Sequence, residues 1–174
     1  MPILQQLRGT QPRADGSRVV VGVVTNSDHR VPGILTSLGL RVGPLRYGED
    51  ASRTSSTGEA HDVDFVVMSY DVGCEKPDTR MFRAAEELLM KLPAAEGTEL
   101  SAWERIYVGD EYAKDVVGAT GAGWKAVLVG REAAIKHEGV VSLEGEEPGS
   151  LLAVLEKAKA VGVASIAGLT KWLP

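Results

Sequence analysis

Short apolar runs alternate with amphipathic segments along most of this 174-residue chain. Runs rich in β-branched residues, which are typical of strands buried in a parallel sheet, cover residues 19–25, 64–70, 105–108 and 125–129. Apolar residues at helical spacing, which indicate helices packed on such a sheet, recur in segments 2–8, 32–38, 78–89, 116–122 and 151–160. Strands that alternate with helices predict an α/β fold with a doubly wound parallel sheet.

Two stretches interrupt this pattern. Residues 9–17 are polar and rich in turn formers, which predicts a loop. Residues 41–62 combine Gly, Pro, Ser, Thr and charges without periodicity, which predicts a mobile loop insertion at the surface. The length of the chain suits one domain. We therefore expect residues 1–174 to form a single domain with 41–62 as its insertion.

Composition narrows the class of protein. The formal net charge is −5 and no stripe of Lys and Arg occurs, which argues against nucleic-acid binding. No stretch approaches the roughly 20 apolar residues of a membrane helix. Cys74 is the only cysteine, which excludes an internal disulfide and suits a reducing compartment. We therefore expect an acidic protein of the cytoplasm.

Polar residues follow the ends of the predicted strands. Thr25 closes the run 19–25, Lys76 lies in the loop after 64–70, and Asp110 comes soon after 105–108. In doubly wound sheets, ligands bind beyond the carboxyl ends of the strands. Thr25 and Asn26 stand at the start of a helix, where backbone N–H groups can form an anion cradle. The alternative is that residues 25–27 only cap that helix.

Lys76 and two aspartates extend the pattern. Lysine neutralises carboxylate and phosphoryl oxygens as a point charge, and its place before Pro77 displays it ahead of the next helix. Asp110, and Asp115 five residues later, supply carboxylates suited to Mg²⁺. Each residue also has an ordinary interpretation: a solvated lysine, an N-cap at Asp110 and a surface charge at Asp115.

The segments VVTNSD, GCEKPDTRMF and VGDEYAKDVVGATGAGWKAVLVG resemble the second, third and fourth motifs of the haloacid dehalogenase-like (HAD) hydrolases. The resemblance is closest to the capped, phosphatase-like subgroup and implies a Rossmann-like core. It implies that Thr25 binds the phosphoryl group and that Lys76 stabilises the nucleophile and the transferred group. It also implies that Asp110 and Asp115 serve Mg²⁺.

The family's first motif, D-x-D-x-T on the opening strand, has no counterpart ahead of residue 19. Residues 1–8 resemble the helix that follows the cap, and Asp15 lies in a polar loop. We therefore expect a truncated core without the first central strand, the cap domain or the nucleophilic aspartate. Thr25, Lys76 and Asp110 would then be vestigial or repurposed catalytic residues. Mg²⁺, left with at most two carboxylates, would bind weakly.

In the family, the opening strand lies between the strand that ends at Thr25 and the strand that ends at Asp110. Its absence leaves backbone groups that need new partners. The two flanking strands can pair directly, another segment of the chain can insert, or a second chain can fill the gap. We expect direct pairing with self-association, as a homodimer or with a protein partner that covers the gap.

Three functions fit these features. The one we favour is a HAD-like protein that is not a phosphatase and acts by binding or self-assembly. The second is an enzyme that reuses Lys76 and Asp110 for acid–base chemistry at the old HAD site. The third is a truncated form of a Mg²⁺-dependent HAD phosphatase.

Overall fold

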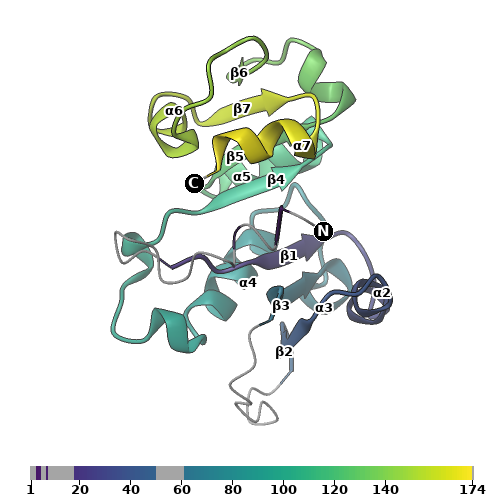
Figure 1. Cartoon of the computed structure of the whole chain (residues 1–174). Helices are drawn as coiled ribbons and strands as arrows, with labels where there is room; N and C mark the ends of the chain where they lie inside the picture. The colour runs from purple at the N-terminus through teal and green to yellow at the C-terminus, as the bar shows by residue number, and fades with distance from the viewer. Residues whose placement is uncertain (1–2, 5–6, 8–17, 50–60, 174) are drawn as a thin grey trace. The chain divides into compact units, whose positions relative to one another are not determined.

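In a computed structural model, which describes residues 3–4, 7, 18–49 and 61–173, the chain forms two compact units (Figure 1). The first unit comprises residues 4–103, and the second comprises residues 104–174 together with 1–3. Each unit has its own parallel sheet and its own helices. The α/β class predicted from the sequence is therefore confirmed, whereas a single domain across 1–174 stays a prediction.

The first unit is built on a three-stranded parallel sheet with the order β1-β3-β2. Its strands are β1 (Gly22–Thr25), β2 (Val42–Arg46) and β3 (Val63–Met68). Its helices are α2 (Val31–Ser37), α3 (Ser69–Val72) and α4 (Arg80–Leu89), followed by 3₁₀ turns at Pro93–Ala95 and Leu100–Ala102. Because Thr25 pairs in register with Met68, the loops after β1 and β3 leave the sheet at the same edge.

Strand β3 and helix α4 form the core of the first unit. In β3, Val66, Val67 and Met68 are at most 1% exposed. The apolar stripe of α4 is buried against the sheet at six positions: Met81, Phe82, Ala84, Ala85, Leu88 and Leu89. Burying a side chain of the size of Leu, Met or Phe contributes about 1.5–3 kcal/mol. This packing therefore fixes α4, which begins at Arg80 just after the loop that carries Lys76.

The prediction of a loop across 41–62 is wrong for Val42–Arg46, which form β2 and pair in parallel with β3. The end of this strand is held by an ion pair, in which Arg46 donates to both carboxylate oxygens of Asp71 at 2.6 and 2.8 Å. In the sequence VGPLR, apolar and polar residues do not alternate regularly, so the pattern did not predict a strand. Residues 50–60 of the predicted insertion lie outside the described residues.

The second unit is built on a four-stranded parallel sheet with the order β4-β5-β7-β6. Its strands are β4 (Ile106–Gly109), β5 (Lys125–Val129), β6 (Val140–Ser142) and β7 (Ala160–Val163). Its helical elements are η4 (Tyr112–Val116, a π-helix), α5 (Val117–Gly121), η5 (Arg131–Ala134), α6 (Leu151–Lys157), α7 (Ile166–Leu169) and η6 (Thr170–Trp172).

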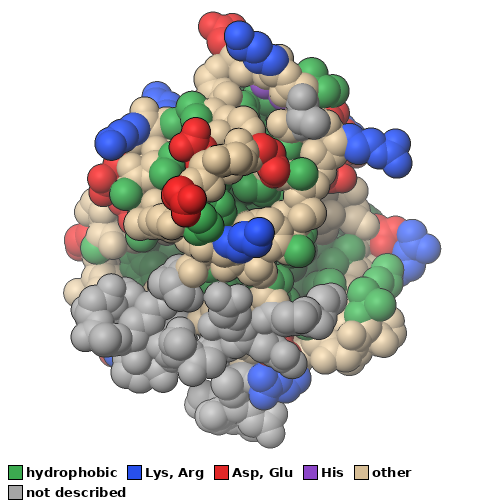
Figure 2. Space-filling model, turned by 45° about the horizontal axis from the view of Figure 1, so that its top comes forward, with side chains coloured by type: hydrophobic (Ala, Val, Ile, Leu, Met, Phe, Trp, Pro, Cys, Tyr) green, Lys and Arg blue, Asp and Glu red, His purple; other side chains and the backbone are tan. Residues whose placement is uncertain are grey.

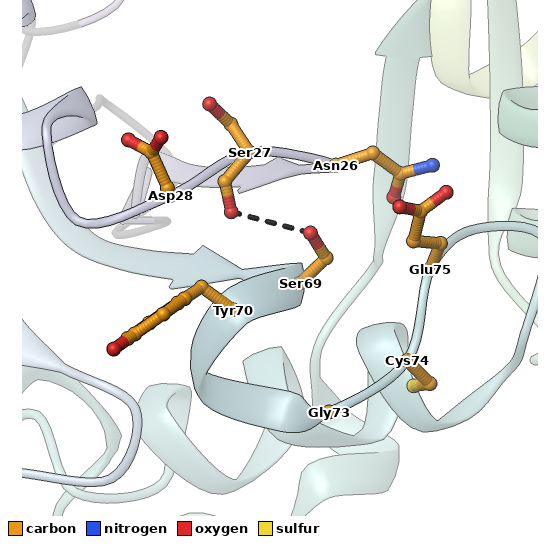
Figure 3. A pocket seen from close by; sticks show the side chains of 8 residues that line it. All are labelled: Asn26, Ser27, Asp28, Ser69, Tyr70, Gly73, Cys74 and Glu75. Atoms are coloured by element: carbon orange, nitrogen blue, oxygen red, sulfur yellow. Dashed lines mark hydrogen bonds between the residues drawn. The ribbon is translucent and has the colours of Figure 1, made fainter.

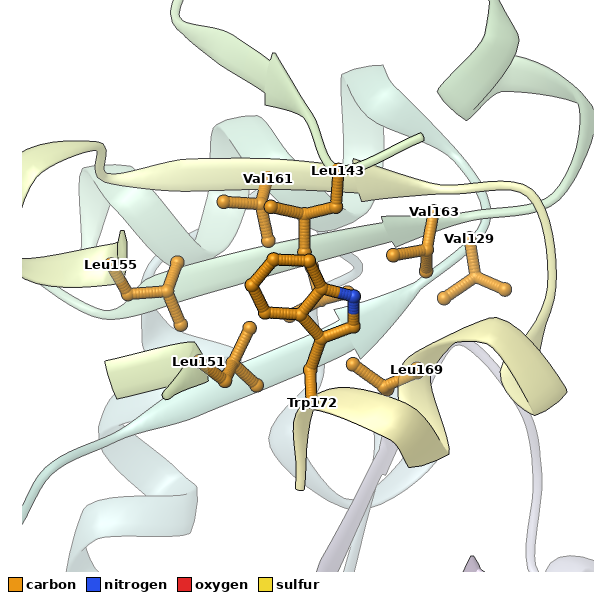
Figure 4. Packing of buried hydrophobic residues seen from close by; sticks show 9 residues of the cluster. Val129, Leu143, Leu151, Leu155, Val161, Val163, Leu169 and Trp172 are labelled. Atoms are coloured by element: carbon orange, nitrogen blue, oxygen red, sulfur yellow. The ribbon is translucent and has the colours of Figure 1, made fainter. Parts of the chain in front are cut away.

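The core of the second unit gathers around Trp172, which is 7% exposed (Figure 4). The indole packs with Leu151 and Leu155 of α6 and with Val161 and Val163 of β7. The predicted helix over 151–160 is too long, because α6 ends at Lys157 and Ala160 already belongs to β7. The four-residue run AVGV follows the helix without a Gly or Pro signal, so sequence periodicity did not separate the two elements.

The surface carries both signs of charge. On the face shown in Figure 2, the described acidic and basic side chains are interspersed with apolar ones. Among the described helices, none combines the length and the hydropathy that a membrane crossing requires.

Strands β1 and β4 are those between which the family's opening strand was expected. Each is the terminal strand of the sheet in its own unit, as the described residues define it. In β4, Val108 is 41% exposed, whereas residues 126–129 of β5 are all buried. Pairing of β1 with β4, and a partner chain at these strands, stay predictions.

Candidate functional site

Asn26 ties the turn after β1 to the loop that carries Lys76. Its Oδ1 accepts a hydrogen bond from the backbone N–H of Lys76 at 2.7 Å, and its Nδ2 donates to the Lys76 carbonyl at 3.2 Å. Both residues are half-buried. We call this pair of bonds the Asn26–Lys76 clamp. Thr25 directly precedes Asn26 as the last residue of β1, so three predicted site residues belong to one constellation.

The alternative that residues 25–27 only cap α2 is wrong. No side chain caps the start of α2, and the side chain of Asn26 is bound in the clamp. The carbonyl of Ser27 accepts hydrogen bonds from the Ser69 hydroxyl and from the Tyr70 backbone N–H, both at 3.2 Å. These bonds join the turn after β1 to α3, on the side of the sheet edge where the clamp lies.

A cavity of about 590 Å³ lies beside the clamp in the first unit (Figure 3). It is lined by residues 26–28 after β1, by Ser69 and Tyr70 of α3, and by residues 73–75. This cavity is wide open to solvent, so it would enclose only part of a bound ligand. Among the described residues, the lining contains two carboxylates, of Asp28 and Glu75, and no Lys or Arg side chain.

Pairing with Arg30 sets the protonation of Asp28, and burial sets that of Cys74. Hydrogen bonds from the side chain and then the backbone of Arg30 lower the pKa of Asp28 to about 2. Asp28 is therefore a fixed negative charge at neutral pH. Burial raises the pKa of the Cys74 thiol, and the charge of Asp78 adds to the effect. Cys74 therefore stays protonated and is a weak nucleophile.

In the second unit, Asp115 anchors the loop after β4. It is 4% exposed, and its Oδ2 accepts hydrogen bonds from the backbone N–H groups of Asp110 and Glu111, both at 3.0 Å. The interpretation of Asp115 as a surface charge is therefore wrong. Asp110 is exposed, and it is not an N-cap, because η4 begins after Glu111 without a side-chain cap.

Gly109 makes this anchor sterically possible. A Cβ atom at this position would lie 2.3 Å from Asp115 Oδ2 and 2.4 Å from its Cγ. Real Cβ atoms essentially never approach so closely, and Asp115 is buried, so its carboxylate has little room to move. A glycine directly before Asp110 therefore allows the Asp115 carboxylate to approach the backbone closely.

A further set of contacts beside Asp110 was not predicted. The Glu132 carboxylate accepts a hydrogen bond from the Tyr112 backbone N–H. The Tyr112 ring stacks on His137 at a centroid distance of 4.1 Å, and its hydroxyl donates to the Glu138 carbonyl at 3.1 Å. These contacts join residues about 20 or more positions apart in the sequence. No local pattern signals them, so sequence reasoning could not find them.

The two predicted magnesium ligands, Asp110 and Asp115, differ in the exposure of their carboxylates and in the hydrogen bonds that these accept. The described part of the chain contains no group of three or more His, Cys, Asp or Glu side chains that could hold a metal ion. Asp110 has an exposed carboxylate, whereas Asp115 Oδ2 already accepts two hydrogen bonds. Mg²⁺ prefers six oxygen ligands and keeps several waters. Binding of Mg²⁺ at Asp110 and Asp115 therefore stays a prediction, and Asp110 is the residue with the exposed carboxylate.

The sequence contains one D-x-D, Asp62-Val63-Asp64. It lies at the start of β3, whereas Thr25 lies beside the end of β3, so it is too far from Thr25 to act on a ligand there. Asp62 is bonded to Arg41 through both carboxylate oxygens, and Asp64 Oδ2 accepts the Val21 N–H at 2.8 Å. The register places Met68 opposite Thr25, and four residues of strand span about 13 Å. This D-x-D is therefore structural.

Comparisons with known proteins support the resemblance. A family model described as HAD-hydrolase-like matches residues 73–144. The mouse haloacid dehalogenase-like hydrolase domain-containing protein 3 is 33% identical over 128 residues, which cover 72% of this chain and 40% of the relative. The glyceraldehyde 3-phosphate phosphatase of Methanothermobacter thermautotrophicus is 34% identical over 101 residues, covering 56% of this chain and 41% of the relative. The chain thus spans about two fifths of the length of these relatives.

Solved structures share the fold. A HAD phosphatase from Thermococcus onnurineus matches 99% of this chain and 55% of its own, with a TM-score of 0.56 and 21% identity. The HAD-hydrolase YfnB from Bacillus subtilis, in a magnesium-bound crystal structure, matches 97% of this chain and 51% of its own, with a TM-score of 0.52 and 13% identity. On these sequence and fold relationships, together with the motifs at the strand ends, the chain belongs to the haloacid dehalogenase-like hydrolase superfamily.

Proposed function

We propose that this chain binds a phosphoryl-bearing ligand at the end of β1 and does not by itself hydrolyse it through an aspartyl intermediate. The Asn26–Lys76 clamp carries the proposal, because it holds the Lys76 loop next to Thr25. A threonine hydroxyl can donate to a phosphoryl oxygen, and a lysine ammonium can neutralise its charge.

The covalent step is left out of the proposed function for a chemical reason. The family's covalent route needs a carboxylate nucleophile at the strand edge where Thr25 lies, and the chain's D-x-D stands at the opposite end of β3. Asp28 lies nearer, but both of its carboxylate oxygens accept hydrogen bonds from Arg30. In the second unit, Asp110 would be the residue that holds a Mg²⁺ ion.

Calorimetric titration with inorganic phosphate tests the binding. Lys76→Ala should weaken phosphate binding about tenfold or more, because hydrogen bonds to charged groups contribute about 1.5–3 kcal/mol. Lys91→Ala, which changes an exposed lysine of the same unit, serves as the control and should leave binding unchanged. Hydrolysis of p-nitrophenyl phosphate that requires Mg²⁺ and disappears in Asp110→Asn would overturn the proposal.

Self-association is the second part of the proposed function. The 41% exposure of Val108, an apolar residue within β4, supports an interface at this terminal strand. The partner is a second copy of the chain or another protein that covers the strand. Light scattering should show a mass above that of one chain, falling on dilution. A single-chain mass throughout the micromolar range argues against this part alone.

One other function has specific support. Glu75 lines the cavity and directly precedes Lys76, which favours metal-free acid–base chemistry on a small metabolite. Turnover without metal that is lost in Lys76→Ala would establish it. A truncated form of a Mg²⁺-dependent HAD phosphatase stays the third prediction. A D-x-D strand encoded upstream in the same transcript would establish that function.

A further inference from the structure

The cavity and the clamp share a wall. Asn26 belongs to both, and Thr25 and Lys76 directly adjoin cavity-lining residues. A phosphoryl group bound between Thr25 and Lys76 therefore leaves the rest of its ligand to lie in the cavity. The lining residues then determine which organic groups are accepted.

Among the described residues, one carboxylate of the cavity is paired with a basic side chain and the other is not. Asp28 forms an ion pair with Arg30 at 2.9 Å. Glu75 is exposed and forms no ion pair with any residue in the described ranges 18–49 and 61–173. A ligand with a negative charge beyond its phosphoryl group therefore meets repulsion from Glu75, whereas an ammonium group meets attraction.

Another part of the lining offers an aromatic surface. Tyr70 also lines the cavity and is 68% exposed, and in Figure 3 its ring extends away from Glu75. Its ring is supported by an edge contact with His29, at a centroid distance of 5.9 Å and an angle of 60°. A tyrosine held in this way presents an apolar face together with a hydroxyl group, which suits an organic group that bears hydroxyls.

We propose that Glu75 and Tyr70 select, for this cavity, phosphate monoesters whose organic part carries hydroxyl or amino groups and no negative charge. The inference rests on the phosphate binding proposed above. It identifies the ligand class by charge, and it assigns the discrimination to Glu75 and the contact with the organic part to Tyr70.

Three probes of similar size separate the effect of charge from that of the phosphoryl group. They are O-phosphoethanolamine, glycerol 3-phosphate and 3-phosphoglycerate, whose organic parts are cationic, neutral and anionic. Titration calorimetry at low ionic strength, where screening is weak, should give the strongest binding for the first probe and the weakest for the third. Each charge step should change the dissociation constant about fivefold, as expected for charges about 4 Å apart in water.

Two substitutions test the assignment. Glu75→Gln should bring the three dissociation constants to within about twofold of each other, because it removes the charge and keeps the shape. Glu87→Gln, which changes an exposed glutamate on α4, is the matched control and should keep the full range. Tyr70→Ala should weaken glycerol 3-phosphate binding and leave inorganic phosphate binding unchanged.

The outcomes distinguish this inference from the function on which it rests. If inorganic phosphate binds but the parent chain does not discriminate among the three probes, the charge selection is overturned and the proposed function stands. Discrimination that persists in Glu75→Gln overturns the charge selection in the same way. If neither phosphate nor any of the probes binds, both are overturned.

Discussion

The side chain of Asn26 is bonded to both backbone groups of Lys76, a residue 50 positions further along the chain. An asparagine side chain can make this pair of bonds because it carries an acceptor and a donor in one planar group. The two bonds fix the backbone on which Lys76 stands, whatever its ammonium group contacts. They therefore position the loop after β3 relative to the end of β1.

Substitution of Asn26 tests this relationship. Asn26→Ala removes both bonds and should lower the free energy of unfolding by about 1–3 kcal/mol, measured by urea denaturation. Asn26→Asp keeps an acceptor for the Lys76 N–H but places a carboxylate beside the Lys76 carbonyl. Its free energy of unfolding should therefore lie between those of the parent and the alanine variant. Phosphate binding should weaken in the same order.

A control separates the clamp from general effects of surface substitution. Ser37→Ala, at an exposed position on α2, should change stability by less than about 0.5 kcal/mol. If Asn26→Ala proves as stable as this control and binds phosphate as the parent does, the clamp does not position Lys76.

The fold could be predicted where a strand is long and rich in β-branched residues. The runs that became β1, β3 and β5 are of this kind, and each was recognised. β7 has four residues and includes Gly162, although all four are buried. β2 includes Gly43 and Pro44. Such strands are determined by their neighbours in the sheet, so their own sequence carries little periodic signal.

The candidate site could be predicted at its chemistry-bearing residues but not at their supports. Thr25 and Lys76 were identified because they follow predicted strands. The clamp made by Asn26 and the contact between Glu132 and Tyr112 depend on which loops meet after folding. Sequence spacing says nothing about such contacts, and this is why Asn26 was expected to bind phosphate rather than to hold Lys76.

The charge of Asp28 should be insensitive to pH until strongly acidic conditions. Its pKa in the folded state is about 2, below the ordinary value of 3.8, because Arg30 donates hydrogen bonds to the carboxylate. Stabilisation from this pair is therefore complete above about pH 4 and is lost as the pH falls toward 2. Carbon NMR of the carboxyl group should show the low midpoint, and Arg30→Ala should raise it toward 3.8. A midpoint near 3.8 in the parent chain contradicts the pairing.

Asp110 and Asp115 belong to one short segment but should behave differently when substituted. Asp115→Ala leaves two backbone N–H groups without their acceptor, and each such loss costs about 1–3 kcal/mol. Asp110→Ala alters an exposed side chain and should change stability by less than about 0.5 kcal/mol. Thermal unfolding measures both, and titration with Mn²⁺ should show the larger loss of metal affinity for Asp110→Ala if that residue holds the ion. Equal losses of stability would show that Asp115 is not the anchor.

Gly109 and Asp115 should be energetically coupled, because a Cβ atom at residue 109 meets the Asp115 carboxylate at 2.3 Å. Gly109→Ala should destabilise the second unit by about 1–3 kcal/mol through overpacking. In an Asp115→Ala background the same substitution should cost much less, since the obstructing carboxylate is gone. A double-mutant cycle measured by urea denaturation should therefore give a coupling of about 0.5–3 kcal/mol. Gly123→Ala provides a contrast: it has a positive φ of 82° and no atom within 4 Å of its Cβ position, so its cost should be the same in both backgrounds. Additive effects at Gly109 and Asp115 would mean that the loop after β4 relaxes freely, and that the close approach does not hold it.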